Sequence, residues 1–478
     1  MKAIFLHSIQ YLVIVIFFFA GACKPSQTSQ GKPLREMPAT YQGDTDTANS
    51  ATINWRKYFS DPLLLSLIDT VLTNNFDLLI AEQRILAAQS GIRFAKGAKA
   101  PTVGAGVAAS INRYGEYTMN GAGNKNTLIY GEQYIPEYLP DFSVGLQTSW
   151  EVDLWGKLGQ RKKAATARWL ARAEGRNLVI TNLVAEVASA YYELMALDQT
   201  LSILDGTIVL QENALEIVRV QKEAARANEL AVKQFESELL SVRSLKIAIA
   251  QEIINTESRI NFLAGRFPET IRRDSLRYSP VELPLVKPGV PATLLLNRPD
   301  IREAELELEA SKADVIAARK EFLPRVNISG AFGWQAFQAG LLFTTPQSIA
   351  LGVLGSLAAP IINRSAIEAA FERATASQLE ALYHYQQTIV NGYLEVYNEL
   401  NAIRSLQQTV ELKSKEAETL TFSIDISADL FRTGRATYLE VLTTQVRALQ
   451  SKLELVNSRR NQFLATVNIY KALGGGWR

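Results

Sequence analysis

Cysteine and histidine are almost absent from this chain: among 478 residues there is one cysteine, and there are two histidines. A single cysteine excludes an intramolecular disulfide, so stability in an oxidising compartment would have to come from packing. Zinc sites made of paired cysteines or spaced histidines lack their ligands. His384, on a predicted long helix, is expected to be a packing or surface residue. The sequence therefore predicts no catalytic residue, no metal site and no cofactor, and so no enzyme.

Proline is missing from residues 141–267 and 361–478, although the chain has 16 prolines in all. Because proline interrupts helices, its absence permits very long ones. A helix from Lys157 to Glu223 is predicted, about 100 Å long at 1.5 Å per residue. Apolar residues at alternating spacings of three and four also predict a coiled-coil seam. They are Ile180, Leu183, Val187, Ala190, Leu194, Leu197, Leu201, Leu204 and Ile208, and then Leu439, Leu442, Val446, Leu449, Leu453, Val456, Phe463, Val467 and Tyr470.

Long apolar runs are also missing, apart from one near the N-terminus. Lys2 precedes an apolar stretch that is too short for a membrane span and is typical of a signal peptide, residues 1–22. Cys23 follows three small residues and resembles the acylated cysteine of a bacterial lipobox, so it is the predicted lipidation site. The alternative is a plain signal peptide with an incidental cysteine. Residues 23–54, rich in Ser, Thr, Gln, Pro and Lys, are predicted to be a lipidated tether.

Two pairs of short segments alternate apolar residues with small or polar ones, which predicts β-hairpins at 101–150 and 324–358. One face of each strand suits lipid, and the other suits a water-filled lumen. Open sheet edges cannot be satisfied inside a bilayer, and single-chain barrels start at eight strands. Four strands per chain therefore predict that several chains share one barrel. The alternative is a soluble pair of hairpins packed on helices, which shows the same alternation.

The sequence after the first hairpin suggests where the chain leaves the membrane. Trp150 and Trp155 are the predicted membrane-interface aromatics, and the basic residues 161–163 follow them. The charge of the whole chain is nearly balanced, with a formal net charge of +2. There is thus no global field to attract nucleic acid, and no nucleic-acid partner is predicted.

A hairpin followed by long helices occurs twice, and Pro101 and Pro324 stand at equivalent places before the two hairpins. The separation between equivalent residues drifts only slightly along the chain, which predicts an internal duplication with a loop of variable length. A helical pattern from Pro62 to Lys99 precedes the first hairpin. The predicted divisions are a first structural repeat at 55–267, an inter-repeat linker and equatorial region at 268–300, and a second structural repeat at 301–478.

Residues 431–440 interrupt two long helical patterns around one glycine. The simplest interpretation is a helix-turn-helix with a glycine C-cap. In an oligomer, however, charged side chains near a coiled-coil tip would ring a narrow entrance, and ion pairs between chains could lock it. The residues predicted to form such a periplasmic gate are Arg432, Gly434, Arg435 and Glu440.

Several motifs together resemble the TolC-like outer-membrane factors, and more narrowly the lipoprotein branch that serves resistance-nodulation-division efflux pumps. The resemblance covers Trp55 to Trp477. The motifs are Phe59-Ser60-Asp61-Pro62-Leu63, Ser149-Trp150-Glu151-Val152-Asp153-Leu154-Trp155-Gly156, Asn297-Arg298-Pro299-Asp300-Ile301, Pro360-Ile361-Ile362 and the ending Tyr470-Lys471-Ala472-Leu473-Gly474-Gly475-Gly476-Trp477.

The resemblance implies a mainly α fold with membrane β: a homotrimer whose four strands per chain form a twelve-stranded β-barrel, continued by an α-helical barrel. In the family, acidic residues just after the second helix turn constrict the entrance. Glu440 occupies one such place, whereas Thr443 replaces a second acid. Ala225 stands where a glycine is common in the first turn.

The implied function is that of a passive exit channel for small molecules and drugs in the outer membrane of a Gram-negative bacterium, lipid-anchored and extending into the periplasm. The implied partners are a periplasmic adaptor, an inner-membrane resistance-nodulation-division pump and outer-membrane lipid. Two alternatives stay open at this point: the outer-membrane component of type I protein secretion, and a lipid-anchored periplasmic coiled-coil scaffold.

Overall fold

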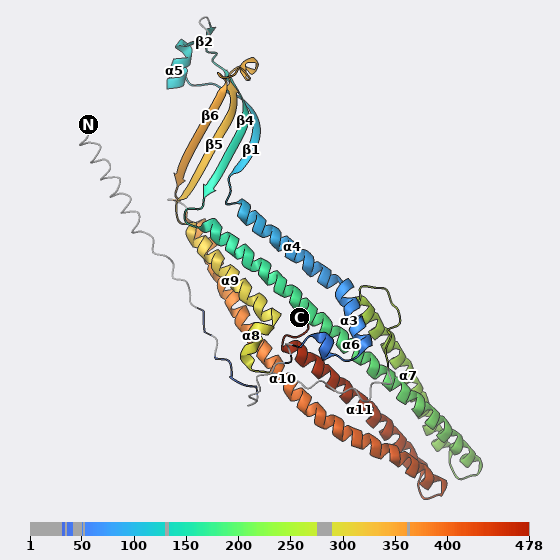
Figure 1. Cartoon of the computed structure of the whole chain (residues 1–478). Helices are drawn as coiled ribbons and strands as arrows, with labels where there is room; N and C mark the ends of the chain where they lie inside the picture. The colour runs from blue at the N-terminus through green and yellow to red at the C-terminus, as the bar shows by residue number, and fades with distance from the viewer. Residues whose placement is uncertain are drawn as a thin grey trace.

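The computed structural model describes residues 31–33, 36–41, 50, 53–129, 133–274, 289–360 and 364–477. The predicted signal peptide and Cys23 lie outside these residues, as do Ile361 and Ile362 of one motif. The described chain is elongated, with a β-sheet at one end and two helical turns at the other (Figure 1).

The sheet has four antiparallel strands in the order β1-β4-β5-β6. The predicted strands are present, although β4 begins earlier and ends later than the alternation suggested. The long loop of the first hairpin contains a short helix and a two-stranded ribbon. The elements are β1 (Thr102–Asn112), α5 (Met119–Asn126), β2 (Leu128–Ile129), β3 (Gln133–Tyr134), β4 (Leu139–Val152), β5 (Arg325–Ala336), η4 (Ala339–Leu341) and β6 (Ile349–Ala358).

Each hairpin is followed by a very long helix, a turn and a shorter helix. The first long helix, α6 (Lys157–Glu223), has the predicted bounds and 67 residues, and α7 (Glu229–Leu263) has 35. In the second half α10 (Ser365–Arg432) has 68 residues and α11 (Tyr438–Ala472) has 35. The matching lengths confirm the predicted internal duplication.

The predicted helical pattern from Pro62 to Lys99 is present, as two helices. It divides into α3 (Pro62–Asn74) and α4 (Phe76–Gly97), which follow the short α2 (Trp55–Tyr58). Asn75 lies between them with an extended backbone (ψ 129°), and its side chain accepts hydrogen bonds from the first turn of α4. The same side chain donates to the Leu263 carbonyl at 2.9 Å, so a tertiary contact fixes the break. By length and composition no single described helix could cross a membrane, and only the bent pair α3 and α4 together meets the criterion.

Four helices lie side by side next to the sheet, in the order α4, α6, α9 (Pro299–Lys320) and α10 (Figure 1). The short η3 (Pro291–Thr293) and α8 (Leu294–Asn297) lead into α9. The seam between α6 and α9 is built from buried alanines, whose small side chains let the two helices approach closely. These alanines are Ala164, Ala167, Ala310 and Ala313.

The C-terminal glycines pack the end of the chain against the last residues of the inter-repeat region. Gly474 has φ +87°, and a Cβ there would lie 2.7 Å from the Asn297 carbonyl, so only glycine fits. The Trp477 indole N–H is shared between the carbonyl oxygens of Asn297, at 3.2 Å, and Gly474, at 3.0 Å. The terminal motif therefore has a structural role in this chain.

The predicted tether is wrong for the part of it that the structure describes. Tyr41 is 1% exposed, and its ring stacks on Tyr393 of α10 with centroids 5.3 Å apart. Upstream, Gln386 of α10 donates to the Lys32 carbonyl at 3.0 Å. The polar composition of residues 23–54 gave no sign that Tyr41 would be buried. Burial of the Tyr41 ring holds the described part of this segment along α10.

Tyr41→Ala should lower the free energy of unfolding by about 3 kcal/mol, because it removes a buried aromatic ring. Tyr41→Phe is the matched control. The Tyr41 hydroxyl has no hydrogen-bond partner among the described residues, so its removal should be close to neutral. Denaturant titration of the detergent-solubilised protein measures both. If both variants lost the same free energy of unfolding, the hydroxyl group and not the ring of Tyr41 would be the stabilising part.

Candidate gate and membrane junction

The strand register places the apolar residues of all four strands on one face of the sheet. Across the sheet, Ala105 pairs with Leu146, Leu146 with Phe332, and Phe332 with Leu351. Val107 and Val353 on this face are 82% and 76% exposed in the single chain, so the face needs an apolar environment.

The opposite face carries small and polar side chains. Gly104 pairs with Gln147, which pairs with Ala331, and Gln335 donates to the Asp141 carboxylate at 2.9 and 3.0 Å. Leu139 and Leu354 are the large apolar exceptions. Together the two faces match a wall between lipid and water, as the alternation predicted.

Within the described residues, β1 and β6 each pair on one side only, with β4 and β5 respectively. Each therefore presents a row of unpaired backbone N–H and C=O groups along its outer edge. The strands have 11 and 10 residues, the length that spans a bilayer at a tilt. The two edges run antiparallel to each other, so β6 of one copy can pair with β1 of the next.

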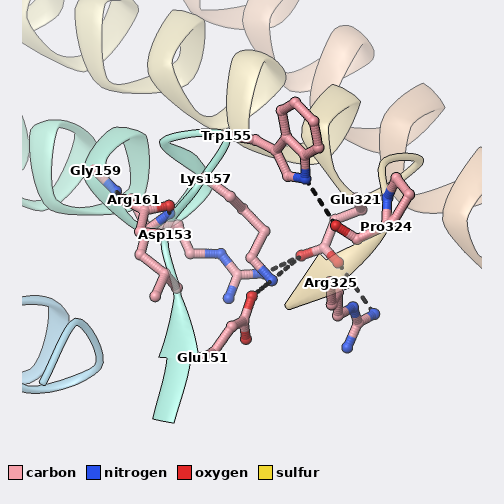
Figure 2. Close-up of polar contacts among 10 residues, drawn as sticks. Glu151, Asp153, Trp155, Lys157, Gly159, Arg161, Glu321, Pro324 and Arg325 are labelled. Atoms are coloured by element: carbon pink, nitrogen blue, oxygen red, sulfur yellow. Dashed lines mark hydrogen bonds and ion pairs between the residues drawn. The ribbon is translucent and has the colours of Figure 1, made fainter. Parts of the chain in front are cut away.

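Figure 2 shows the junction at which β4 enters α6 and α9 enters β5. The Trp155 indole N–H donates to the Pro324 carbonyl at 2.7 Å, tying the two corners together. Gly156 has φ +71°, and the Asp153 carboxylate accepts from the backbone N–H groups of Leu158 and Gly159 at 2.8 and 2.7 Å. The carboxylate thus caps α6, whose N-cap residue is a glycine with no side chain to do so.

Glu321 is the centre of the ion pairs at this junction. It accepts from Arg161 at 2.6 Å and from Arg325 at 3.2 Å, and it lies 3.7 Å from the Lys157 ammonium. Lys157, whose side chain is 8% exposed, also pairs with Glu151 at 2.5 Å. The sequence prediction missed Lys157, Glu151 and Glu321, because Glu321 is more than 160 positions from Lys157 and Glu151 and the cluster leaves no local pattern.

The two predicted interface aromatics both lie at this junction. Trp150 lies two residues before the end of β4, and its indole N–H donates to the Lys99 carbonyl at 2.9 Å. Trp155 is 44% exposed. Each ring thus joins a strand end to the chain just before a hairpin while keeping part of its surface outside the protein, an arrangement suited to a membrane–water boundary.

The predicted gate residues lie in the turn between α10 and α11. Gly434 has φ +71°, and a Cβ there would meet nothing within 4 Å. The Arg435 backbone N–H donates to the Leu430 carbonyl at 2.8 Å, and the Gly434 N–H donates to Phe431 at 3.1 Å. This is the helix-ending motif in which a left-handed residue satisfies the last carbonyls.

The gate side chains have local partners in the single chain. Glu440 accepts from the Thr437 backbone N–H at 2.6 Å and from its hydroxyl at 2.9 Å, forming a capping box at the start of α11. These hydrogen bonds lower the pKa of Glu440. Arg432 pairs with Asp429, an acidic residue that the sequence prediction missed. The Arg435 side chain forms no ion pair with any described residue.

The turn between α6 and α7 repeats this geometry with one difference. Its left-handed residue is Ala225, with φ 55°, where the second turn has Gly434. The Arg226 N–H donates to the Gln221 carbonyl at 2.8 Å, and Asn228 caps α7. A Cβ in this conformation costs roughly 1 kcal/mol. The first turn is therefore strained where the second is not.

A hydrophobic cluster packs the two turns against each other. Leu215 and Val218 of α6, Val232 and Phe235 of α7, and Val441 of α11 are all buried in it. Because of this contact, the turn between α10 and α11 can move only by sliding across the turn between α6 and α7 or by moving together with it.

At mid-length, Arg298 joins three parts of the chain. Its guanidinium donates to Asp300 at 2.6 and 3.0 Å, to Glu395 at 2.7 Å and to the Ala472 carbonyl at 2.7 Å. Burial lowers the pKa of Arg298, but hydrogen bonds and charge from Asp300 and Glu395 outweigh burial and raise it. The Arg-Pro-Asp motif is thus a structural clamp in this chain.

The family model for outer membrane efflux proteins matches residues 67–266 and 290–475 of the chain. The chain belongs to the outer membrane efflux protein family. It is 28% identical over 443 residues to the pyoverdine export outer membrane protein OpmQ of Pseudomonas putida, covering 92% of each protein. It is 24% identical over 475 residues to the probable outer membrane lipoprotein SilC of Salmonella typhimurium, covering 97% of this chain and 98% of SilC.

The fold is that of solved members. The outer-membrane channel OprN superposes with a TM-score of 0.81 at 24% identity, covering 95% of this chain and 99% of OprN. The predicted family, the outer-membrane location and the function as an efflux channel are confirmed. CusC of Escherichia coli, which is 26% identical over 435 residues, is named a cation efflux system protein, and a solved CusC structure with a TM-score of 0.78 is titled for transmembrane channel formation.

The two turns of this outer membrane efflux protein make a matched pair of backbone variants. Ala225→Gly should raise the free energy of unfolding by about 1 kcal/mol, because it relieves the left-handed strain. Gly434→Ala should lower it by a similar amount, and only through backbone strain, since the added methyl group meets open space. Chemical denaturation of the helical region measures both. A loss of stability in Ala225→Gly would contradict the strain at this turn.

Proposed function

We propose that three copies of this chain form a duct across the outer membrane, through which small molecules driven by an inner-membrane pump leave the cell. Each copy supplies four strands to a barrel and its long helices to a tunnel through the periplasm. The duct has no enzymatic activity and supplies no energy. Selection of the cargo belongs to the pump, because a wide lumen discriminates little.

The observation that carries this proposal is the pair of open edges on a sheet with one apolar face. In a bilayer every backbone group needs a partner, and the cost of each unsatisfied group is several kcal/mol. A four-stranded sheet cannot close on itself, whereas neighbouring copies can close it edge to edge. Type I secretion and a soluble scaffold are less well supported, since relatives such as OpmQ are named for the export of small molecules, and the exposed apolar face needs lipid.

We also propose that acylated Cys23 anchors the mature chain, which resembles the probable lipoprotein SilC. Trp150 and Trp155 would then mark the periplasmic boundary of the bilayer. The predicted repeats at 55–267 and 301–478, joined by the equatorial region 268–300, remain the proposed division of the mature chain.

We place the gate at the turn between α10 and α11. The capping box of Glu440 and the pair of Arg432 with Asp429 fix the local geometry of this turn. Gly434 lets the turn adopt the left-handed geometry without strain, and Arg435 is available for a contact between chains. Opening would separate the three copies of this turn around the axis of the trimer.

Disulfide crosslinking of the sheet edges tests the duct directly. In a Cys23→Ser background, Val107→Cys on β1 combined in turn with Ile349→Cys, Leu351→Cys, Val353→Cys or Leu357→Cys on β6, which lie on the same apolar face, should give covalent oligomers of up to three chains on oxidation. At least one combination should form them, because the antiparallel edges of neighbouring copies must pair within the bilayer.

The matched control uses the centre of the sheet. Val144→Cys with Trp334→Cys joins two positions that already pair within one chain, so it should form no oligomer. If no edge combination forms covalent oligomers while the control bridge forms normally, the shared barrel is wrong.

Glu440→Ala should raise the conductance of the isolated channel in planar bilayers, because it removes the capping box and loosens the start of α11. Glu440→Gln separates two explanations. Glutamine retains capping ability but not charge, so a closed Gln variant assigns the role to the helix cap, whereas an open one assigns it to the negative charge. Unchanged conductance in both variants would remove Glu440 from the gate.

A further inference from the structure

The membrane-proximal ends of three helices carry basic side chains that the protein leaves without partners. Lys96 lies in the last turn of α4, Lys162 and Lys163 lie in the second turn of α6, and Arg319 and Lys320 lie in the last turn of α9. We call these five residues the basic collar. None of the five forms an ion pair with any described residue.

Three nearby carboxylates are already occupied, whereas Glu368 and Glu372, in the first two turns of α10, form no ion pair with any described residue. Glu321 accepts from Arg161 and Arg325, Glu151 pairs with Lys157, and Asp153 caps α6 and lies 3.5 Å from the Lys99 ammonium. In α6 the first acidic residue is Glu174. The collar is therefore an excess of positive charge at one level of the molecule, although the whole chain has a net charge of only +2.

The helix dipole explains only part of this pattern. Cations at the C-terminal ends of α4 and α9 are favourable there, so Lys96, Arg319 and Lys320 have a simple structural explanation. The N-terminal end of α6 is different, because cations oppose the dipole at that end. Lys162 and Lys163, in the second turn of α6, are exposed, form no ion pair with any described residue and gain nothing from the dipole of their own helix. An anion from outside the chain would supply the missing partner.

The position of the collar identifies the anion. The apolar face of the sheet ends at Val152 and Val326, beside the junction of Figure 2, and the collar begins about one to two helical turns further on. That is the level of lipid headgroups in the leaflet that faces the periplasm. At the other end of the sheet, Arg113 pairs with Glu137 and Lys125 pairs with Glu116, so no comparable excess exists there among the described residues.

We propose that the basic collar binds the phosphate groups of anionic phospholipids in the periplasm-facing leaflet, with Lys162 and Lys163 as its main contacts. This rests on the proposed position of the sheet in the membrane. Bound lipid would fix the depth and tilt of the barrel at the junction where the strands continue into the helices.

Binding of phosphatidylglycerol to the purified full-length channel, followed by native mass spectrometry, tests the proposal. Each basic residue near an anionic surface contributes about fivefold in affinity. The double variant Lys162→Gln and Lys163→Gln should therefore bind phosphatidylglycerol at least about tenfold more weakly than the wild type, and binding of phosphatidylcholine should not change. Raising the salt concentration should weaken wild-type binding of phosphatidylglycerol as well.

Lys57→Gln with Lys471→Gln is the matched control, since both lysines are exposed and distant from the sheet, and their loss lowers the charge equally. This control should bind phosphatidylglycerol as the wild type does. Equally weakened phosphatidylglycerol binding in both double variants would show that only the net charge matters, and it would contradict a specific role for the basic collar.

Two further results bear on the source of the phosphate. Inorganic phosphate at millimolar concentration should not displace the lipid, and displacement would make the collar a general anion site. Conductance of the Lys162→Gln and Lys163→Gln channel should be normal, which keeps this test separate from the duct. Wild-type lipid affinity in that variant would overturn the proposal even if the channel conducts.

Discussion

The structure depends on one constraint: the backbone N–H and C=O groups at the outer edges of the sheet find no hydrogen-bond partners in a lipid bilayer. A sheet of four strands with one apolar face is stable in a membrane only if its outer edges are paired, and in this chain β1 and β6 have no second neighbour. Pairing across copies then sets the symmetry, and the symmetry determines what the helices can form. Four helices per copy, placed side by side below the sheet, continue the wall of a tube.

The junction transmits this geometry from strands to helices. Trp155 binds the Pro324 carbonyl, Asp153 caps α6, and Glu321 gathers basic side chains from α6 and β5. Further along, Arg298 and the terminal glycines fasten the two repeats and the C-terminus together. The far end is held by a hydrophobic cluster between the two turns, and by a capping box and a left-handed turn on the surface. The ion pairs at these turns are exposed, whereas Lys157 at the junction and Arg298 at mid-length are buried, which suits a channel that opens at its periplasmic end.

Much of this was predictable from residues close together in sequence. The alternation from Thr102 to Ile111 predicts a strand and its two faces, and the absence of proline after Lys157 permits a helix whose bounds are correct. The turn at Gly434 was also predictable, because glycine ends helices in the left-handed conformation.

Contacts between distant residues were not predictable in this way. The break at Asn75 depends on a hydrogen bond to Leu263, and the burial of Tyr41 depends on a ring 352 positions away in α10. Lys157, Glu151 and Glu321 form one cluster only after the hairpins fold. The partner of Arg432 is near in sequence, but Asp429 looks like any other charge on a helix surface until the side chains are placed.

The most direct test of the shared wall is the mass of the particle in mild detergent. Light scattering, with the detergent contribution subtracted, should give three copies of the 52.9 kDa chain, less the mass of the predicted signal peptide, and end-on electron micrographs should show a ring. A monodisperse particle containing one copy, with no ring, would contradict the account.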